Sequence, residues 1–255
     1  NPPVRPLPCV VPCKLYFIKR KTTYVCIRPQ MFRVRKTVAL GIFGVGIPAA
    51  IQNLLNVTGM TVLNNFTSAF GADAVAAMGI TQKINMVPMN ISQGLSQGIM
   101  PLISYNYSSG NIPRMRKTLT FTMKIALSFI VCMSAIYFFA ADTVVNLFME
   151  NESIISYGSR FLRGFCLGLP FLCLDFIAVG VFQAVGMGMK SLVFAILRKI
   201  VLEIPALFIL NWLFPLYGLA YAQFFAELIL SLVAIFVLLR MFRDLKQQYE
   251  RQQNA

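Results

Sequence analysis

Six long apolar runs constrain this chain more than any other feature of its sequence. A helix that crosses a bilayer needs about 20 apolar residues, whereas a membrane-spanning strand needs only about ten and alternates in polarity. Each run has the length of a spanning helix. The runs cover residues 38–66, 74–104, 118–141, 157–184, 191–213 and 216–240. The sequence therefore predicts an all-α membrane protein, a bundle of six transmembrane helices in the lipid bilayer.

Composition supports a membrane protein and argues against other classes. Hydrophobic residues make up 57% of the chain and charged residues 13%, whereas a soluble domain is about a quarter charged. The net charge of +14 could indicate a nucleic-acid partner, but nine of the 23 basic residues precede residue 37 and most others flank apolar runs. We therefore expect no nucleic acid as a partner. The chain has no histidine and no nucleophile–base pair, so we expect neither an enzyme nor catalytic residues.

The basic residues also predict an orientation. Nearly all loop Lys and Arg lie in the segment before residue 37, in the 105–117 loop, in the "GMGMK" turn and in the tail from Arg240. The opposite turns carry only acidic charges, from Asp73, Asp142, Glu150 and Glu152. By the positive-inside rule, both termini of this multi-pass protein are expected in the cytoplasm, with the helices in the cell membrane.

Three parts follow from this pattern. Residues 1–36 are predicted to be a basic, Pro-containing cytoplasmic connector, 37–243 the six-helix transmembrane lobe, and 244–255 a cytoplasmic tail. The chain starts with Asn and shows no signal-peptide pattern, which suggests a piece of a longer protein. Cys9 and Cys13 are spaced C-x3-C, but no second pair or histidine completes a zinc site, so no metal is expected.

Amides and thioethers form a stripe on each of the first two apolar runs when residues are placed at 100° intervals. Interhelical hydrogen bonds would explain any one of these residues. Two long stripes together favour a cavity for a bulky guest that is recognised with little specificity. The residues predicted to line this substrate cavity are Asn53, Asn56, Asn64, Gln82, Met86, Met89, Gln93 and Gln97.

Two carboxylates inside the runs are the predicted ion-coupling residues. Asp175 lies deep in the fourth run, with glycine and aromatic residues on its face and no obvious permanent partner. A carboxylate within a membrane can exchange a proton or hold a cation such as Na⁺. A structural ion pair, with Lys83 as one possible partner, is the alternative for Asp175. Glu227, in the middle of the sixth run, is the second candidate.

Other charged residues in the runs are interpreted as structural. Lys199 and Glu203 are spaced i,i+4 in the fifth run, so we expect them to pair. Arg198 is assigned to the same structural set. Arg160 and Arg163 begin the fourth run, and we expect their heads to reach out to the membrane interface.

Several segments carry a resemblance to a known family. "GIPAAIQNLLNVTGMTVLNNF", "GITQKINMVPMNISQGLSQGIMPLISYNYSSGN" and "PLYGLAYAQFFAELI" resemble the multidrug and toxic compound extrusion (MATE) transporters, and the likeness covers about residues 15–243. The order of the segments is similar to that of the family's helices seven to twelve. The resemblance implies one lobe of a twelve-helix antiporter, with an N-terminal six-helix lobe as its partner. Such proteins expel cationic or amphipathic small molecules in exchange for Na⁺ or H⁺, without a cofactor.

The resemblance also bears on the ion site. Family members with a cation site in this lobe use carboxylates on helices seven and ten, and Asp175 approximates the position on helix ten. The carboxylate on helix seven is absent, and Asn56 stands about there. The coupling ion can therefore be either Na⁺ or H⁺. A lipid-linked saccharide flippase of the same superfamily is the alternative function, for which a strongly cationic cavity would be expected. A membrane scaffold without transport is a third class, and the polar residues within four of the runs count against it.

Overall fold

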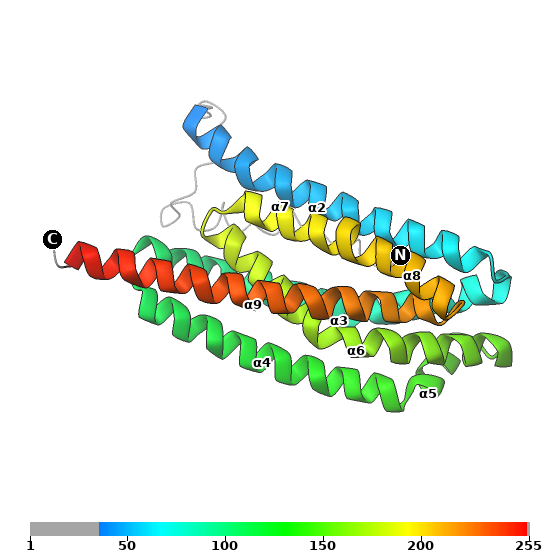
Figure 1. The fold of residues 1–255 in the computed structure, drawn as a ribbon. Helices are drawn as coiled ribbons and strands as arrows, with labels where there is room; N and C mark the ends of the chain where they lie inside the picture. The colour runs from blue at the N-terminus through cyan, green and yellow to red at the C-terminus, as the bar shows by residue number, and fades with distance from the viewer. Residues whose placement is uncertain (1–35, 254–255) are drawn as a thin grey trace, which may run out of the picture. The chain divides into compact units, whose positions relative to one another are not determined.

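The computed structural model describes residues 36–253, and these residues contain helices and no strand. The chain divides into the units Asn1–Leu40 and Gly41–Ala255, and the helical bundle belongs to the second. The predicted connector, with Cys9 and Cys13, lies outside the described residues except for its last one. The helices drawn in Figure 1 are α2 (Lys36–Ser68), α3 (Ala72–Ser108), α4 (Ile112–Phe139), α5 (Ala141–Asn146), α6 (Glu152–Ala184), α7 (Gly188–Ile196), α8 (Ile204–Leu213) and α9 (Gly218–Gln253).

Each predicted span corresponds to helical structure, so the six-helix bundle is confirmed. The fifth span is made of α7, a π-helical segment η2 (Leu197–Glu203) and α8, which follow one another directly. Helices α2, α4, α6 and α9 are each long and apolar enough to cross a membrane on their own. The second span is less apolar because of its amides, and charges interrupt the fifth. The short helix α5 was not expected from the sequence.

The turn between α3 and α4 shows why the chain reverses at "SSGN". Gly110 has a φ of 71°, a left-handed conformation that residues with a side chain rarely adopt. The side chain of Asn111 then accepts a hydrogen bond from the backbone N–H of Arg114 at 3.1 Å. Pro113 follows in the first turn of α4, where no N–H is needed. The polar loop thus ends one helix and caps the next.

Helix α6 forms the centre of the bundle, and small residues let its neighbours approach. It contacts α3, α4, α5, α7 and α9, and 78% of its most apolar stretch is buried, compared with 6% in α2. A Cβ added at Gly164 would lie 2.8 Å from the Cβ of Ala220 on α9. On the side of α3, the hydroxyl of Ser96 donates to the carbonyl of Phe176 on α6 at 2.6 Å. Close packing of small residues is typical of helices associating in membranes.

A proline lies within α6 without ending it. Pro170 has no N–H, so the carbonyl four residues before it, at Cys166, loses its helical donor. The hydroxyl of Ser134 on α4 donates to that carbonyl instead. Since a free carbonyl is expensive inside a bilayer, this bond explains how the helix continues to the carboxylate further along.

The outer surface of the bundle suits lipid. Large apolar side chains on α4, α8 and α9 are more than 60% exposed in the lobe, including Phe121, Phe139, Trp212 and Phe236. Helix α9 has 36 residues, which at a rise of about 1.5 Å each make roughly 54 Å, more than the ~30 Å of a hydrocarbon core. The predicted tail is therefore, as far as Gln253, a continuation of α9.

Arg160 and Arg163 lie about two to three turns into α6, and each makes a polar contact with a neighbouring segment. Arg163 pairs with Asp142 of α5, with 2.7 Å between Nη2 and Oδ2. Arg160 donates from Nη1 to the hydroxyl of Tyr217 at 3.0 Å. The interfacial position of both side chains stays a prediction. The exposed Arg163–Asp142 pair contributes about 1 kcal/mol or less to stability.

Candidate functional site

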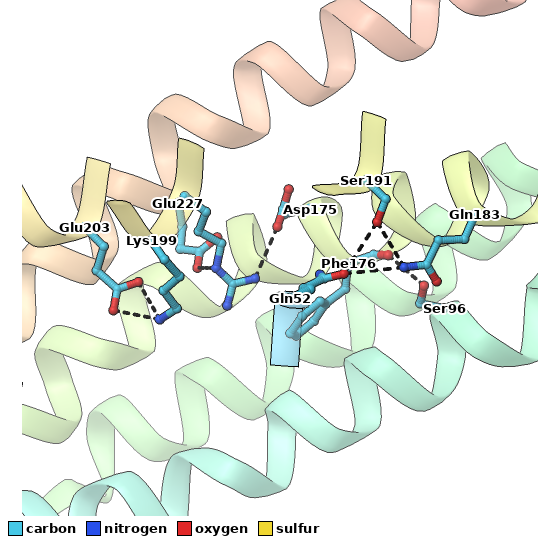
Figure 2. Close-up of polar contacts among 10 residues, drawn as sticks. Gln52, Ser96, Asp175, Phe176, Gln183, Ser191, Lys199, Glu203 and Glu227 are labelled. Carbon is cyan, nitrogen blue, oxygen red and sulfur yellow. Dashed lines mark hydrogen bonds and ion pairs between the residues drawn. The ribbon is translucent and has the colours of Figure 1, made fainter. Parts of the chain in front are cut away.

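Five ionisable side chains from three elements are buried together inside the bundle (Figure 2). We call them the buried ion group: Asp175 of α6, Arg198, Lys199 and Glu203 of η2, and Glu227 of α9. No side chain of the group is more than 10% exposed. Charges removed from water in this way are tolerated only when they are paired or neutralised. The pairing within the group therefore decides what it can do.

Arg198 lies between two carboxylates. Its Nη1 is 3.3 Å from Oδ2 of Asp175, and its Nε is 3.0 Å from Oε1 of Glu227. The guanidinium carbon also lies 5.1 Å from the ring centroid of Phe176, a cation–π contact. The contact with Glu227 has the distance of an ion pair without the direction of a hydrogen bond. Within residues 36–253, Oδ1 of Asp175 and both carboxylate oxygens of Glu227 accept no hydrogen bond.

Lys199 and Glu203, the second pair of the group, bind one another. Lys199 Nζ lies 2.7 Å and 2.6 Å from the two carboxylate oxygens of Glu203, so the pair expected from the i,i+4 spacing is formed. Helix α2 approaches this pair through Gly59. A Cβ there would lie 3.0–3.2 Å from atoms of Lys199 and Glu203, tighter than ordinary contact. A larger residue at position 59 would therefore press directly on the pair.

The π-helical segment explains how neighbouring charges turn inward. Arg198, Lys199 and Glu203 are all buried although they lie within one short stretch of the fifth span. Pro205 follows directly and cannot donate to a carbonyl in the preceding turn. A π-helix is a wider turn that frequently occurs at functional sites. The widened turn and the following proline thus occur together where the charges lie.

The expectation for Asp175 was wrong in one respect. The sequence suggested no permanent partner, or Lys83 as a structural one, whereas the structure pairs Asp175 with Arg198. Lys83 is exposed. Arg198 was assigned a structural role with Lys199 and Glu203, and its contacts with both predicted coupling carboxylates were missed. Its presence in an apolar run was a visible signal, but its partners depend on how three helices pack.

A second polar cluster was also not predicted. Gln183 of α6 donates from Nε2 to the hydroxyl of Ser191 on α7 at 3.0 Å and to Oε1 of Gln52 on α2 at 3.4 Å. Ser191 donates to the same Gln52 oxygen at 3.4 Å. Figure 2 shows the contacts among Gln183, Ser191 and Gln52 as a set separate from those of the buried ion group. Gln52 connects α2 to this cluster.

The predicted cavity residues lie on the outside of the lobe. Exposed side chains are those of Asn53, Asn64, Met86, Gln93 and Gln97, and half-buried ones are those of Asn56, Gln82 and Met89. Gln82 donates from Nε2 to Oδ1 of Asn64 at 3.1 Å, which joins α3 to α2. These two residues thus make an interhelical bond of the kind left open by the sequence. The exposed amides and thioethers do not belong to the lobe's own core.

Comparisons with known proteins support the family resemblance found in the sequence. The MatE family model matches residues 48–209. Over 224 residues the chain is 32% identical to the "Multidrug export protein MepA" of Staphylococcus saprophyticus, a match of 88% of this chain and 49% of that protein. The protein of the same description from Staphylococcus aureus is 33% identical over 225 residues, again 88% and 49%. The chain spans about half the length of the curated relatives it matches.

Solved structures show the same fold. An outward-facing multidrug resistance MATE family transporter of the MOP superfamily superposes with a TM-score of 0.86 at 22% identity, covering 93% of this chain and 54% of that one. A MOP superfamily transporter from Pyrococcus furiosus gives a TM-score of 0.85 at 21% identity, with coverages of 92% and 54%. At this level of identity the likeness concerns the fold alone.

Proposed function

Because this chain belongs to the MatE family, we propose that it forms one six-helix lobe of a multidrug antiporter in the cell membrane. The assembled transporter, this lobe with a partner lobe of six helices, exports cationic or amphipathic molecules while Na⁺ or H⁺ moves inward. Its relatives described as multidrug export proteins support export of drugs as the activity. Asp175 and Glu227 are the proposed coupling residues.

The buried ion group is the observation that carries this proposal. Ionisable residues inside a membrane bundle are expensive and usually functional. Asp175, Arg198 and Glu227 come from α6, η2 and α9, so a change of charge at one of them acts on the packing of three elements. An ion drives a conformational change only if it binds one conformation better than the other. A shared guanidinium between two carboxylates offers such a difference.

Ethidium efflux from a drug-sensitive host tests the function. Cells that produce the assembled transporter are expected to lose preloaded ethidium faster than cells without it, as measured by fluorescence. A scaffold would leave efflux unchanged at equal membrane levels. A flippase would instead restore growth of a strain that lacks its own lipid-linked saccharide flippase, without an effect on ethidium. Either of these results would exclude drug export.

Cysteine labelling tests the topology. In a chain whose six native cysteines are replaced, single cysteines at positions 73 and 150 are expected to react with an impermeant maleimide added outside intact cells. Cysteines at 110 and 246 are expected to react only after the membrane is opened. The reason is the separation of acidic and basic turns along the chain. The reverse pattern would invert the proposed orientation.

The polar stripes give a further prediction. If the outward-facing amides line the space between the two lobes, Gln93→Leu and Asn56→Leu should change which drugs are exported while the membrane level stays normal. Gln82→Leu removes the bond to Asn64 as well, so it should also reduce stability, by about 1 kcal/mol. Drug resistance profiles and protein levels are compared in parallel. Loss of protein in all three variants would favour a purely interhelical role.

A further inference from the structure

The buried ion group holds more carboxylates than cations. Asp175, Glu203 and Glu227 face Arg198 and Lys199, so the group carries one net negative charge when every member is ionised. Lys199 and Glu203 neutralise one another at 2.6 Å, and Gly59 of α2 closes over them. The excess charge therefore belongs to the set formed by Asp175, Arg198 and Glu227. A net charge so deeply buried favours the uptake of one positive charge.

The position of Arg198 restricts what this positive charge can be. Its guanidinium lies 3.3 Å from Asp175 and 3.0 Å from Glu227, so it already occupies the space at one oxygen of each carboxylate. Within the described residues, the oxygens free to accept are Oδ1 of Asp175 and Oε2 of Glu227. Phe176 covers a face of the guanidinium with an aromatic ring.

A sodium ion and a proton make different demands on such a set. Na⁺ in transporters is coordinated by several oxygens at once, often including carbonyls of unwound helix. Here α6 is helical on both sides of Asp175, and the Phe176 carbonyl already accepts from Ser96. A fixed guanidinium beside both carboxylates also repels a second cation. A proton needs only one carboxylate oxygen, and Oδ1 of Asp175 and Oε2 of Glu227 are both open to it.

We propose that the Asp175–Arg198–Glu227 set takes up a proton and not Na⁺, and that Arg198 determines this choice. This inference rests on the proposed function. A proton from the outer side forms an O–H bond with one of the two carboxylates, which changes from −1 to neutral. Arg198 then pairs with the carboxylate that stays ionised. Dissociation of the O–H bond toward the cytoplasm returns the proton to water and restores the charge.

Transport driven by separate gradients tests the choice of ion. The assembled transporter is reconstituted in proteoliposomes, and ethidium movement is followed under a pH gradient in Na⁺-free choline buffer. A second set carries a Na⁺ gradient at equal pH on both sides. We expect the pH gradient to drive transport and the Na⁺ gradient to leave it at the level of empty vesicles. Transport driven by Na⁺ at equal pH would overturn the inference.

Two variants of Arg198 test its role. Arg198→Lys keeps the positive charge and is expected to stay proton-driven and insensitive to Na⁺. Arg198→Gln leaves two buried carboxylates without their cation, so it is expected to gain a response to the Na⁺ gradient. An Arg198→Gln protein that inserts normally and still responds to pH alone would show that Arg198 does not set the choice. The wild-type measurement decides the ion even if this variant does not fold.

Asp175→Asn separates a failure of this inference from a failure of the proposed function. If Na⁺ drives the wild-type protein and Asp175→Asn abolishes that transport, Asp175 still has a coupling role, but the assignment of the proton as the coupling ion is wrong. If Asp175→Asn transports like the wild type under every gradient, the coupling role of Asp175 itself is wrong. Transport by the wild type that needs the pH gradient, and is lost in Asp175→Asn, supports both.

Discussion

Asp175→Asn is expected to abolish ion-driven efflux while drug binding largely survives. The change keeps the shape of the side chain and one oxygen near Arg198 but removes the titratable charge. Arg198 and Glu227 then balance one another, so the set is already neutral before an ion binds. A set that is already neutral no longer favours uptake of the coupling ion. Ion binding can then not shift the lobe between its conformations. We expect at least about a tenfold lower initial rate of ethidium efflux, measured under a defined gradient.

Two comparisons make this result specific. Asp142→Asn makes the same chemical change at a carboxylate that is 60% exposed and paired with Arg163, and it is expected to transport like the wild type. Glu227→Gln also neutralises the set and should lower efflux, because the two carboxylates share one guanidinium. Ethidium binding to the purified variants checks that the drug site remains. Wild-type efflux by Asp175→Asn would remove this residue from the coupling mechanism.

Much of the fold could be predicted from the sequence because a helix that spans a bilayer needs a long run of apolar residues. Each apolar run became a helix, and turns formed where Gly110 or Asn111 could supply an unusual conformation or a cap. The short helix α5 was not predicted because its six residues are too few for a spanning helix, although Ala141 and Val145 are buried on one face. The order of packing around α6 was also not predicted, since all six runs are similarly apolar and only contacts distinguish them.

Asp175 and Glu227 were predicted from their place inside apolar runs, but the pairing within the site could be predicted only where local spacing decides. The Lys199–Glu203 pair followed from i,i+4 spacing on one element. The position of Arg198 did not, because its partners come from α6 and α9 and because the π-helical turn departs from 100° per residue. Projection onto a regular helix therefore misplaces the side chains of this segment. The contacts of Gln52 were not predicted for a similar reason, since its partners Gln183 and Ser191 lie on other helices.

Gly180→Leu is expected to cause a large loss of folded protein. A Cβ at position 180 would overlap the hydroxyl oxygen of Ser96 and lie 3.3 Å from its carbonyl oxygen, so α3 and α6 would have to separate. That separation would also break the bond from Ser96 to Phe176, next to the buried ion group. Overpacking on this scale costs about 3 kcal/mol. Fluorescence-detected size exclusion and thermal stability measure the loss.

Gly79→Leu is the matched control, because a Cβ added at Gly79 of α3 meets nothing within 4 Å. It should leave stability near that of the wild type. A milder pair tests the contact itself: Gly180→Ala should destabilise by about 1 kcal/mol or more, and adding Ser96→Ala should recover part of that loss by removing the overlapping oxygen. The recovery is expected although Ser96→Ala alone removes the hydrogen bond to the Phe176 carbonyl. Purely additive losses in the double variant would mean that α3 and α6 do not meet at these two residues.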